Sequence, residues 1–245
     1  MSSARPSNGR VPRLFVDAAL AAGAVVELPP PSAHYLVNVL RLGDGAEVFA
    51  FDDRTGEWRA RLVLAKRRAS LAAECMTRPR DTVPDLWLCA APLKKGRIDW
   101  LAEKACELGV ARLWPVITRR SVVERPKLER LRAHMVEAAE QCGRTALPEL
   151  AEPVTLPALL AGWPEGRSLY CCDETGGVPM LEAAAARPGP AAILIGPEGG
   201  FTADERQAIQ SLAAAVPVSL GPRILRADTA AAAAVALWMA VAGDW

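Results

Sequence analysis

The alternation of hydrophobic and polar residues changes its period near residue 80. Before that point, alternation with a period of two predicts three half-buried β-strands, at 47–52, 57–64 and 70–76. A short strand is expected earlier, at 12–16, and Ser32 is expected to N-cap a helix over 33–40. The pattern therefore predicts a small, mostly β module over residues 1–80.

Continuous apolar runs replace the alternation from residue 85 onward. They predict strands at 85–91, 112–117, 168–172, 191–196 and 216–220. Between and after them, helices are expected at 97–108, 128–142, 204–214 and 229–242. Apolar strands that alternate with helices indicate a parallel sheet covered on both faces, in which ligands bind beyond the carboxyl ends of the strands. The residues after Ile195 and Leu220 are therefore the first candidates for a site.

The composition is that of a globular protein. The chain has 245 residues, of which 51% are hydrophobic and 23% charged, and this excludes a largely disordered or fibrous chain. No apolar run reaches the ~18 residues that span a bilayer, and the polar start lacks the apolar core of a signal peptide. We therefore expect no membrane segment and a cytoplasmic location.

Cysteine and histidine usage argues against a metal site. The six cysteines are scattered and form no C-x-x-C pair, which favours reduced, mostly buried thiols. With only His34 and His134 and no ligand cluster, we expect no bound metal.

The net charge of +1 conceals an asymmetry. Residues 1–80 carry 12 Lys and Arg against 8 Asp and Glu, whereas residues 81–245 carry 17 against 20. This distribution is compatible with a polyanionic partner for the first module.

The loop after the fourth strand of the second module is rich in glycine. Residues 196–200 read Gly-Pro-Glu-Gly-Gly, so the backbone can turn sharply and present bare amides to a ligand. The spacing is neither a dinucleotide fingerprint nor a Walker loop. Thr202 and Glu205 are expected to form a capping box that begins the next helix. Glu198 is a separate case, since the turn itself requires no carboxylate there.

A second loop follows the last strand and contains two arginines. Asp228 or Thr229 is expected to N-cap the final helix, although a catalytic role for Asp228 stays open. Arg223 and Arg226 lie near the start of that helix, where the dipole disfavours cations. They therefore require an anionic partner or a functional reason.

Six ordered motifs resemble the RsmE family over nearly the whole chain. This family comprises SPOUT-class methyltransferases that modify N3 of a uridine in 16S ribosomal RNA of the small ribosomal subunit. The motifs are Pro12-Arg13-Leu14-Phe15, His34-Tyr35-Leu36-Val37-Asn38-Val39-Leu40-Arg41, Glu103-Lys104-Ala105-Cys106-Glu107-Leu108-Gly109, Glu140-Gln141-Cys142-Gly143-Arg144, Ile195-Gly196-Pro197-Glu198-Gly199-Gly200 and Leu220-Gly221-Pro222-Arg223-Ile224-Leu225-Arg226.

The resemblance implies a two-domain α/β protein. A PUA-like, RNA-binding β-barrel is implied within residues 1–80, and a trefoil-knotted SPOUT methyltransferase domain with a mainly parallel sheet over 81–245. The helix expected at 229–242 is apolar on nearly every face and must be covered all round, either within the chain or by a second copy. Because SPOUT relatives pair through their knots, we expect a homodimer. S-adenosylmethionine is the implied cofactor, held largely by loop backbone at Gly196, Pro197, Glu198, Gly199, Leu220, Gly221, Ile224, Leu225 and Arg226.

The expected chemistry gives an arginine a role. N3 of uridine becomes nucleophilic as its proton leaves and charge spreads onto the flanking carbonyl oxygens, which a guanidinium would stabilise. We assign this role to Arg226, with a salt bridge to Asp228 or to a partner chain as the structural alternative. Glu198 and Asp228 are candidate proton acceptors. Many relatives have Thr-Glu where this chain has Ala227-Asp228, which weakens the case for Asp228.

The basic residues of the first module are candidates for RNA contacts. They are Arg13, Arg41, Lys66, Arg67 and Arg68, although the last three also fit a solvated strand edge.

Two other functions stay open. One is a non-catalytic, RNA-binding ribosome assembly factor that uses the knotted domain as a scaffold. The other is an α/β enzyme acting on a nucleotide-like small molecule, with the β module as an oligomerisation domain.

Overall fold

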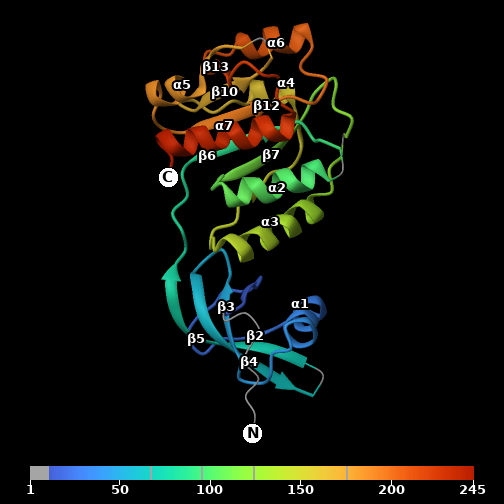
Figure 1. Ribbon diagram of the computed structural model, residues 1–245, viewed down its shortest axis with the longest axis vertical. Coiled ribbons are helices and arrows are strands. Elements are labelled where there is room, and N and C mark those ends of the chain that lie inside the picture. Colours follow the sequence, from blue (N-terminus) through green and yellow to red (C-terminus); the bar gives the residue numbers. More distant parts are fainter. Residues whose placement is uncertain (1–10, 67, 95, 124, 175) are drawn as a thin grey trace. The chain divides into compact units, whose positions relative to one another are not determined.

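The computed structural model describes residues 11–66, 68–94, 96–123, 125–174 and 176–245 (Figure 1). The chain divides into two compact units. Unit 1 holds the described residues up to Thr82 together with Ala139–Ala146, and unit 2 holds Val83–Ala138 and Leu147–Trp245. Unit 1 thus includes eight residues from later in the chain, which the hydrophobic pattern had not separated from the second module.

Unit 1 is built on a five-stranded sheet with the order β1-β3-β4-β5-β2. Its strands are β1 (Arg13–Phe15), β2 (Val25–Glu27), β3 (Glu47–Phe51), β4 (Gly56–Ala65) and β5 (Arg68–Pro79). β1 runs parallel to β3, and the other neighbours are antiparallel. The alternating residues Val48, Leu62 and Leu71 are fully buried. The strands predicted from the period of two are therefore confirmed.

The helical segment of unit 1 begins earlier than predicted. Helix α1 spans Pro30–His34 with Pro29 at the N-cap, and it continues as the π-helix η1 over Tyr35–Val39. The proline ring at Pro30 presets the φ angle of the first turn, and its missing N–H is not needed there. The prediction that Ser32 caps the helix was wrong, because Ser32 lies inside α1.

Unit 2 contains the expected parallel sheet, with the order β11-β13-β10-β12-β6-β7-β8 and β9 beside β7. All its strand pairs are parallel. The strands are β6 (Leu86–Ala90), β7 (Arg112–Ile117), β8 (Glu149–Leu150), β9 (Val154–Thr155), β10 (Ser168–Cys172), β11 (Val178–Pro179), β12 (Ala191–Ile195) and β13 (Ala215–Ser219). Every residue of β12 is buried, as a strand covered on both faces requires.

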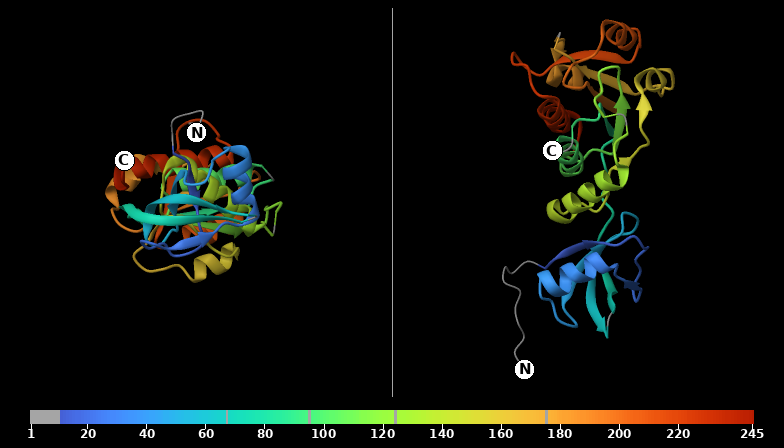
Figure 2. Two further views of the ribbon diagram at one scale, coloured as in Figure 1. Left: turned by 90° about the horizontal axis from the view of Figure 1, so that it is seen from below. Right: turned by 90° about the vertical axis from the view of Figure 1, so that its right-hand side faces the viewer.

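Helices cover both faces of this sheet. They are α2 (Arg97–Glu107), α3 (Leu128–Cys142), α4 (Leu156–Ala161), α5 (Met180–Ala186), α6 (Ala203–Gln210) and α7 (Ala227–Ala242). α7 packs against α2, α5 and the central strands β6 and β12, while α4 packs against α6 and β7. Figure 2 shows α7 and α4 on opposite sides of the sheet. Among the described residues, no helix is long and apolar enough to cross a membrane.

The last helix corrects a second capping prediction. α7 starts at Ala227, and Arg226 occupies the N-cap position in an extended conformation without a side-chain cap. Asp228 therefore lies in the first turn, where its carboxylate faces the positive end of the helix dipole. Thr229 follows it inside the helix, so neither residue is the N-cap.

No cysteine of the described residues forms a disulfide. Cys89, Cys106 and Cys171 are buried, whereas Cys75 and Cys142 are exposed. The expected burial therefore holds for only part of the set.

Candidate active site

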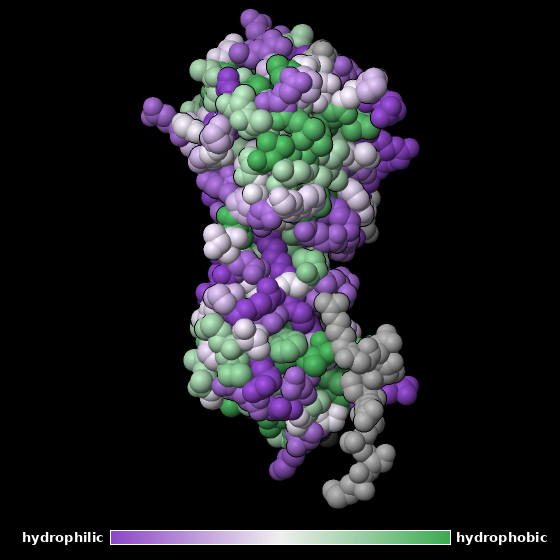
Figure 3. Space-filling model, turned by 60° about the vertical axis from the view of Figure 1, so that its left-hand side comes forward, coloured by the Kyte–Doolittle hydropathy of each residue, from purple (hydrophilic) through white to green (hydrophobic). Residues whose placement is uncertain are grey.

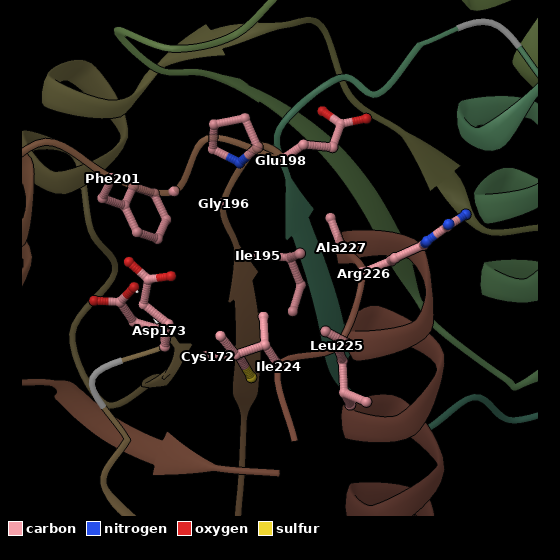
Figure 4. Close-up of a pocket in the computed structure, with 14 residues that line it drawn as sticks. Cys172, Asp173, Ile195, Gly196, Glu198, Phe201, Ile224, Leu225, Arg226 and Ala227 are labelled. Carbon is pink, nitrogen blue, oxygen red and sulfur yellow. Dashed lines mark hydrogen bonds between the residues drawn. The ribbon is translucent and has the colours of Figure 1, made fainter. Parts of the chain in front are cut away.

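Three loops at the carboxyl edge of the unit 2 sheet enclose a cavity of about 280 Å³. They follow β10, β12 and β13, as expected for a ligand site in a parallel sheet. A second cavity of about 150 Å³ adjoins the first, and both are lined by Cys172, Asp173, Glu174, Ile224, Leu225 and Ala230. In Figure 4, Asp173 and Phe201 lie at one side of the larger cavity and Glu198 and Arg226 at the other.

The glycine loop after β12 contributes four predicted residues, of which three line the larger cavity. They are Gly196, Pro197 and Glu198. Gly199 does not line it, and its carbonyl accepts a hydrogen bond of 2.6 Å from Nη1 of Arg120. A Cβ at Gly196 would lie only 3.0 Å from the ring of Phe201, so this glycine allows the ring to pack under the loop.

A capping box holds the end of this loop, as predicted. Thr202 Oγ1 accepts from the Glu205 amide, and the Glu205 carboxylate accepts from the Thr202 amide at 2.9 Å. Its other oxygen accepts from the Arg119 amide at 2.7 Å. Burial by itself disfavours the charged form of Glu205, but these hydrogen bonds outweigh it and hold the pKa of Glu205 below its usual value.

The loop after β13 contributes residues to both cavities. Leu220 and Gly221 line the smaller cavity, while Ile224 and Leu225 line both. Gly221 has φ of 106°, a conformation that residues with a Cβ rarely adopt. Ile224 is 85% exposed and lines both cavities, so its apolar side chain is available to a ligand there.

Arg226 lines the larger cavity, whereas Asp228 lines neither. The Arg226 side chain is exposed, and within the described part of the chain no carboxylate pairs with it. Asp228 instead accepts a hydrogen bond from the Thr229 amide and lies 3.9 Å from Nη1 of Arg97. The intrachain salt bridge considered as the structural alternative for Arg226 is therefore not formed.

Sequence reasoning missed the loop after β10. Asp173 pairs with Nε of Arg206 at 2.7 Å, and Glu174 lies 3.2 Å from Nη2 of the same arginine. Burial raises the pKa of the neighbouring Cys172 thiol, which keeps it protonated. The available signal was positional, since an Asp-Glu pair directly follows a predicted strand at the edge where ligands bind.

The predicted RNA-contact residues of unit 1 differ in exposure. The Arg13 side chain is only 7% exposed, and it pairs with Glu57 at 2.7 Å and donates to the Ala139 carbonyl at 2.6 Å. Its guanidinium is thus used inside unit 1. Arg41, Lys66 and Arg68 are exposed, with Arg68 3.5 Å from Glu27. Arg67 lies outside the described residues.

Comparison with known proteins gives a consistent result. A model of the RNA methyltransferase domain matches residues 80–239, and a model of the RNA methyltransferase PUA domain matches residues 28–73. A Synechocystis protein named ribosomal RNA small subunit methyltransferase E is 35% identical, with 87% of this chain and 72% of the relative covered. A Rickettsia conorii protein of the same name is 30% identical, with 91% and 93% covered.

Two solved structures resemble the whole chain. One is a Legionella pneumophila protein described as a methyltransferase in complex with the bound cofactor SAM, with 28% identity, a TM-score of 0.88 and coverage of 96% of this chain and 100% of that one. The other is a ribosomal RNA small subunit methyltransferase E from Neisseria gonorrhoeae bound to S-adenosyl methionine, with 29% identity, a TM-score of 0.84 and the same coverage. The chain therefore belongs to the RNA methyltransferase family that includes the ribosomal RNA small subunit methyltransferase E proteins.

Proposed function

We propose that this protein uses S-adenosylmethionine to methylate N3 of a uridine in 16S ribosomal RNA of the small ribosomal subunit. The observation that carries the proposal is the cavity at the carboxyl edge of the sheet, whose lining includes both motif-bearing loops. Both structures with the cofactor bound cover nearly the whole chain, which supports the same site. We further propose that these loops form the trefoil knot of the SPOUT class.

The lining of the cavities fits this cofactor chemically. Ile195, Phe201 and Leu225 offer apolar surface to an adenine ring, and the glycine loops offer backbone donors and acceptors. Asp173 and Glu174 share a single arginine, Arg206, so this pair of carboxylates keeps a net negative charge, which complements the positive sulfonium and ammonium groups of S-adenosylmethionine. When bound, this cofactor supplies an electrophilic methyl group.

Arg226 is the residue we assign to the uridine. A guanidinium without a carboxylate partner can donate two hydrogen bonds from a planar fork. Donation to a uridine carbonyl oxygen favours the ionised base, and it stabilises the charge that develops on that oxygen as N3 becomes nucleophilic. Of the two candidate proton acceptors, Glu198 is favoured, because it lines the cavity and Asp228 does not.

We assign RNA binding in unit 1 to the exposed cations Arg41, Lys66 and Arg68, with the PUA domain match in support.

For unit 2 we propose a homodimer. Between Asp228 and Asp244 the chain has no charged residue, and exposed apolar side chains lie on α7 at Val241 and on the adjacent α5 at Leu181. Figure 3 shows apolar surface gathered on one face of this unit.

The test is nucleoside mass spectrometry of 16S ribosomal RNA after incubation with the protein and S-adenosylmethionine labelled on its methyl group. We expect label in 3-methyluridine at one position. Label in another nucleoside, or none in either free RNA or small subunits, would contradict the proposal.

A further inference from the structure

Five exposed cations of unit 2 without a salt bridge in the described residues lie at the edge of the sheet that carries the cavity. Residues 81–245 have an acidic balance, with 17 Lys and Arg against 20 Asp and Glu. Several arginines of unit 2 are neutralised by carboxylates: Arg112 by Glu149, Arg130 by Asp99, Arg167 by Asp85 and Arg206 by Asp173. In the described part of the chain, five exposed cations without a salt bridge follow the carboxyl ends of β6, β7 and β13: Lys94, Arg119, Arg120, Arg223 and Arg226. Three others lie elsewhere, Arg125 and Lys127 before α3 and Arg187 after α5.

Arg119 and Arg120 are held in place beside the glycine loop. The loop after β7 turns at Thr118, whose amide donates to Ser121 Oγ at 2.9 Å. The Arg119 amide donates to Glu205 at 2.7 Å, and the Arg120 guanidinium donates to the Gly199 carbonyl at 2.6 Å. This carbonyl lies between two residues that line the larger cavity, Glu198 and Gly200. The backbone of the arginine pair is thus fixed at the cavity rim.

The side chains of these two arginines remain available to an anion. Both are exposed, and neither lines either of the two cavities, so neither is part of the proposed cofactor site. Arg120 uses one of its five N–H donors on a neutral carbonyl, so it keeps its charge and four donors. Arg119 forms no salt bridge in the described residues, although its charge acts on the Glu205 carboxylate. An exposed guanidinium without a salt bridge suits a phosphate oxygen.

We propose that Arg119 and Arg120 form an RNA-backbone contact of unit 2, binding phosphates next to the uridine that enters the cavity. The proposal rests on the proposed function and places a second RNA contact beside the reaction site, apart from the cations of unit 1. Because Arg120 also donates a hydrogen bond to the Gly199 carbonyl, a phosphate bound to Arg120 would contact the loop that carries Glu198 through this arginine.

The test uses the full-length protein with Arg119→Ala and Arg120→Gln, singly and combined. Glutamine at 120 retains an N–H donor for Gly199 but loses the charge, which separates loop support from phosphate binding. Arg187→Ala is the matched control, since Arg187 is an exposed arginine after α5, at the opposite edge of the sheet, and is also without an acidic partner in the described residues.

RNA affinity is measured by filter binding to 16S ribosomal RNA transcribed in vitro, free and assembled into small subunits, over a range of salt concentrations. The combined variant should bind about tenfold more weakly at low salt. The plot of log affinity against log salt concentration should be less steep, its slope falling in magnitude by about 1.4 to 1.8, because each lost phosphate contact removes about 0.7 to 0.9 from that magnitude. Affinity for S-adenosylmethionine, from calorimetry, should stay within about twofold.

Three results would overturn the proposal. The first is wild-type RNA affinity and salt slope in the combined variant, and the second is an equal loss in Arg187→Ala. The third is a loss of cofactor affinity that accounts for the whole defect. Because RNA binding is measured without methyl transfer, a failure of the proposed reaction would appear separately, as absence of 3-methyluridine with the wild-type protein.

Discussion

Glu205 connects three parts of the site, so its removal should reveal how strongly the site depends on one buried carboxylate. Glu205 is 7% exposed. Its two oxygens accept from the amides of Thr202 and Arg119, which anchors the glycine loop, the start of α6 and the loop after β7 to one another. We predict that Glu205→Ala and Glu205→Gln both destabilise unit 2 and weaken cofactor binding.

The magnitude follows from the number of donors left without a partner. Glu205→Ala leaves two amides unsatisfied at ~1 to 3 kcal/mol each, a total of about 2 to 6 kcal/mol. Glu205→Gln keeps one carbonyl acceptor and places an NH2 group against the other amide, so about half of that loss is expected. Glu182→Gln is the matched control, because Glu182 is an exposed carboxylate in the first turn of α5.

Chemical denaturation followed by tryptophan fluorescence is the assay. Six of the seven tryptophans belong to unit 2, and Trp58 belongs to unit 1. Because the pKa of Glu205 is lowered by folding, its contribution should be complete above the unfolded value of about 4.5 and should be lost as the pH falls through the folded value. Equal stability of Glu205→Gln and wild type at pH 7, or a difference that does not shrink in acid, would refute this reasoning.

Three further predictions concern the cofactor loop, the RNA contacts of unit 1 and assembly. Gly221→Val should weaken S-adenosylmethionine binding without unfolding unit 2, because a φ angle of 106° strains a β-branched residue at this exposed turn. Unchanged cofactor affinity in calorimetry would exclude a role of this loop in cofactor binding. A variant that combines Arg41→Ala, Lys66→Ala and Arg68→Ala should bind RNA more weakly and with a smaller salt dependence, while its cofactor affinity stays unchanged. Light scattering should find a dimer at micromolar concentration and a shift toward monomer in Val241→Glu; a monomeric wild type would contradict the pairing.

The regular elements could be predicted because burial imposes its own period on the sequence. The structure confirms the predicted bounds of three elements: the strands at 112–117 and 168–172 and the helix at 128–142. In each of them the hydrophobic pattern continues over the whole element and stops clearly at its end. Helix starts were less secure. At Ser32 and Asp228 a good capping residue was present, but the prolines at 30 and 31 and the extended backbone at Arg226 moved each start upstream.

The parts of the site that depend on glycine-rich backbone were predicted from the sequence. The parts that depend on ion pairs or hydrogen bonds between distant residues were missed. Glycines next to a strand end are visible in a single sequence, so the loops at Gly196 and Gly221 were found. The placement of Asp173 in the cavity lining depends on its contact with Arg206, which is 33 residues away in the sequence. The internal role of Arg13 likewise depends on Glu57 and on the Ala139 carbonyl, and no local pattern encodes either contact.

Single-turnover methylation by Arg226 variants tests the central claim most directly. Wild type, Arg226→Lys and Arg226→Ala are mixed with labelled S-adenosylmethionine and 16S ribosomal RNA, and 3-methyluridine is quantified by mass spectrometry, with cofactor affinity measured in parallel. Lysine keeps the charge but loses the planar fork, so the rate should fall with Lys and fall further with Ala, by about 10²-fold or more for a lost transition-state donor, while cofactor affinity changes little. An Ala variant with a near-normal rate, or one whose whole defect is lost cofactor binding, would contradict the role assigned to Arg226.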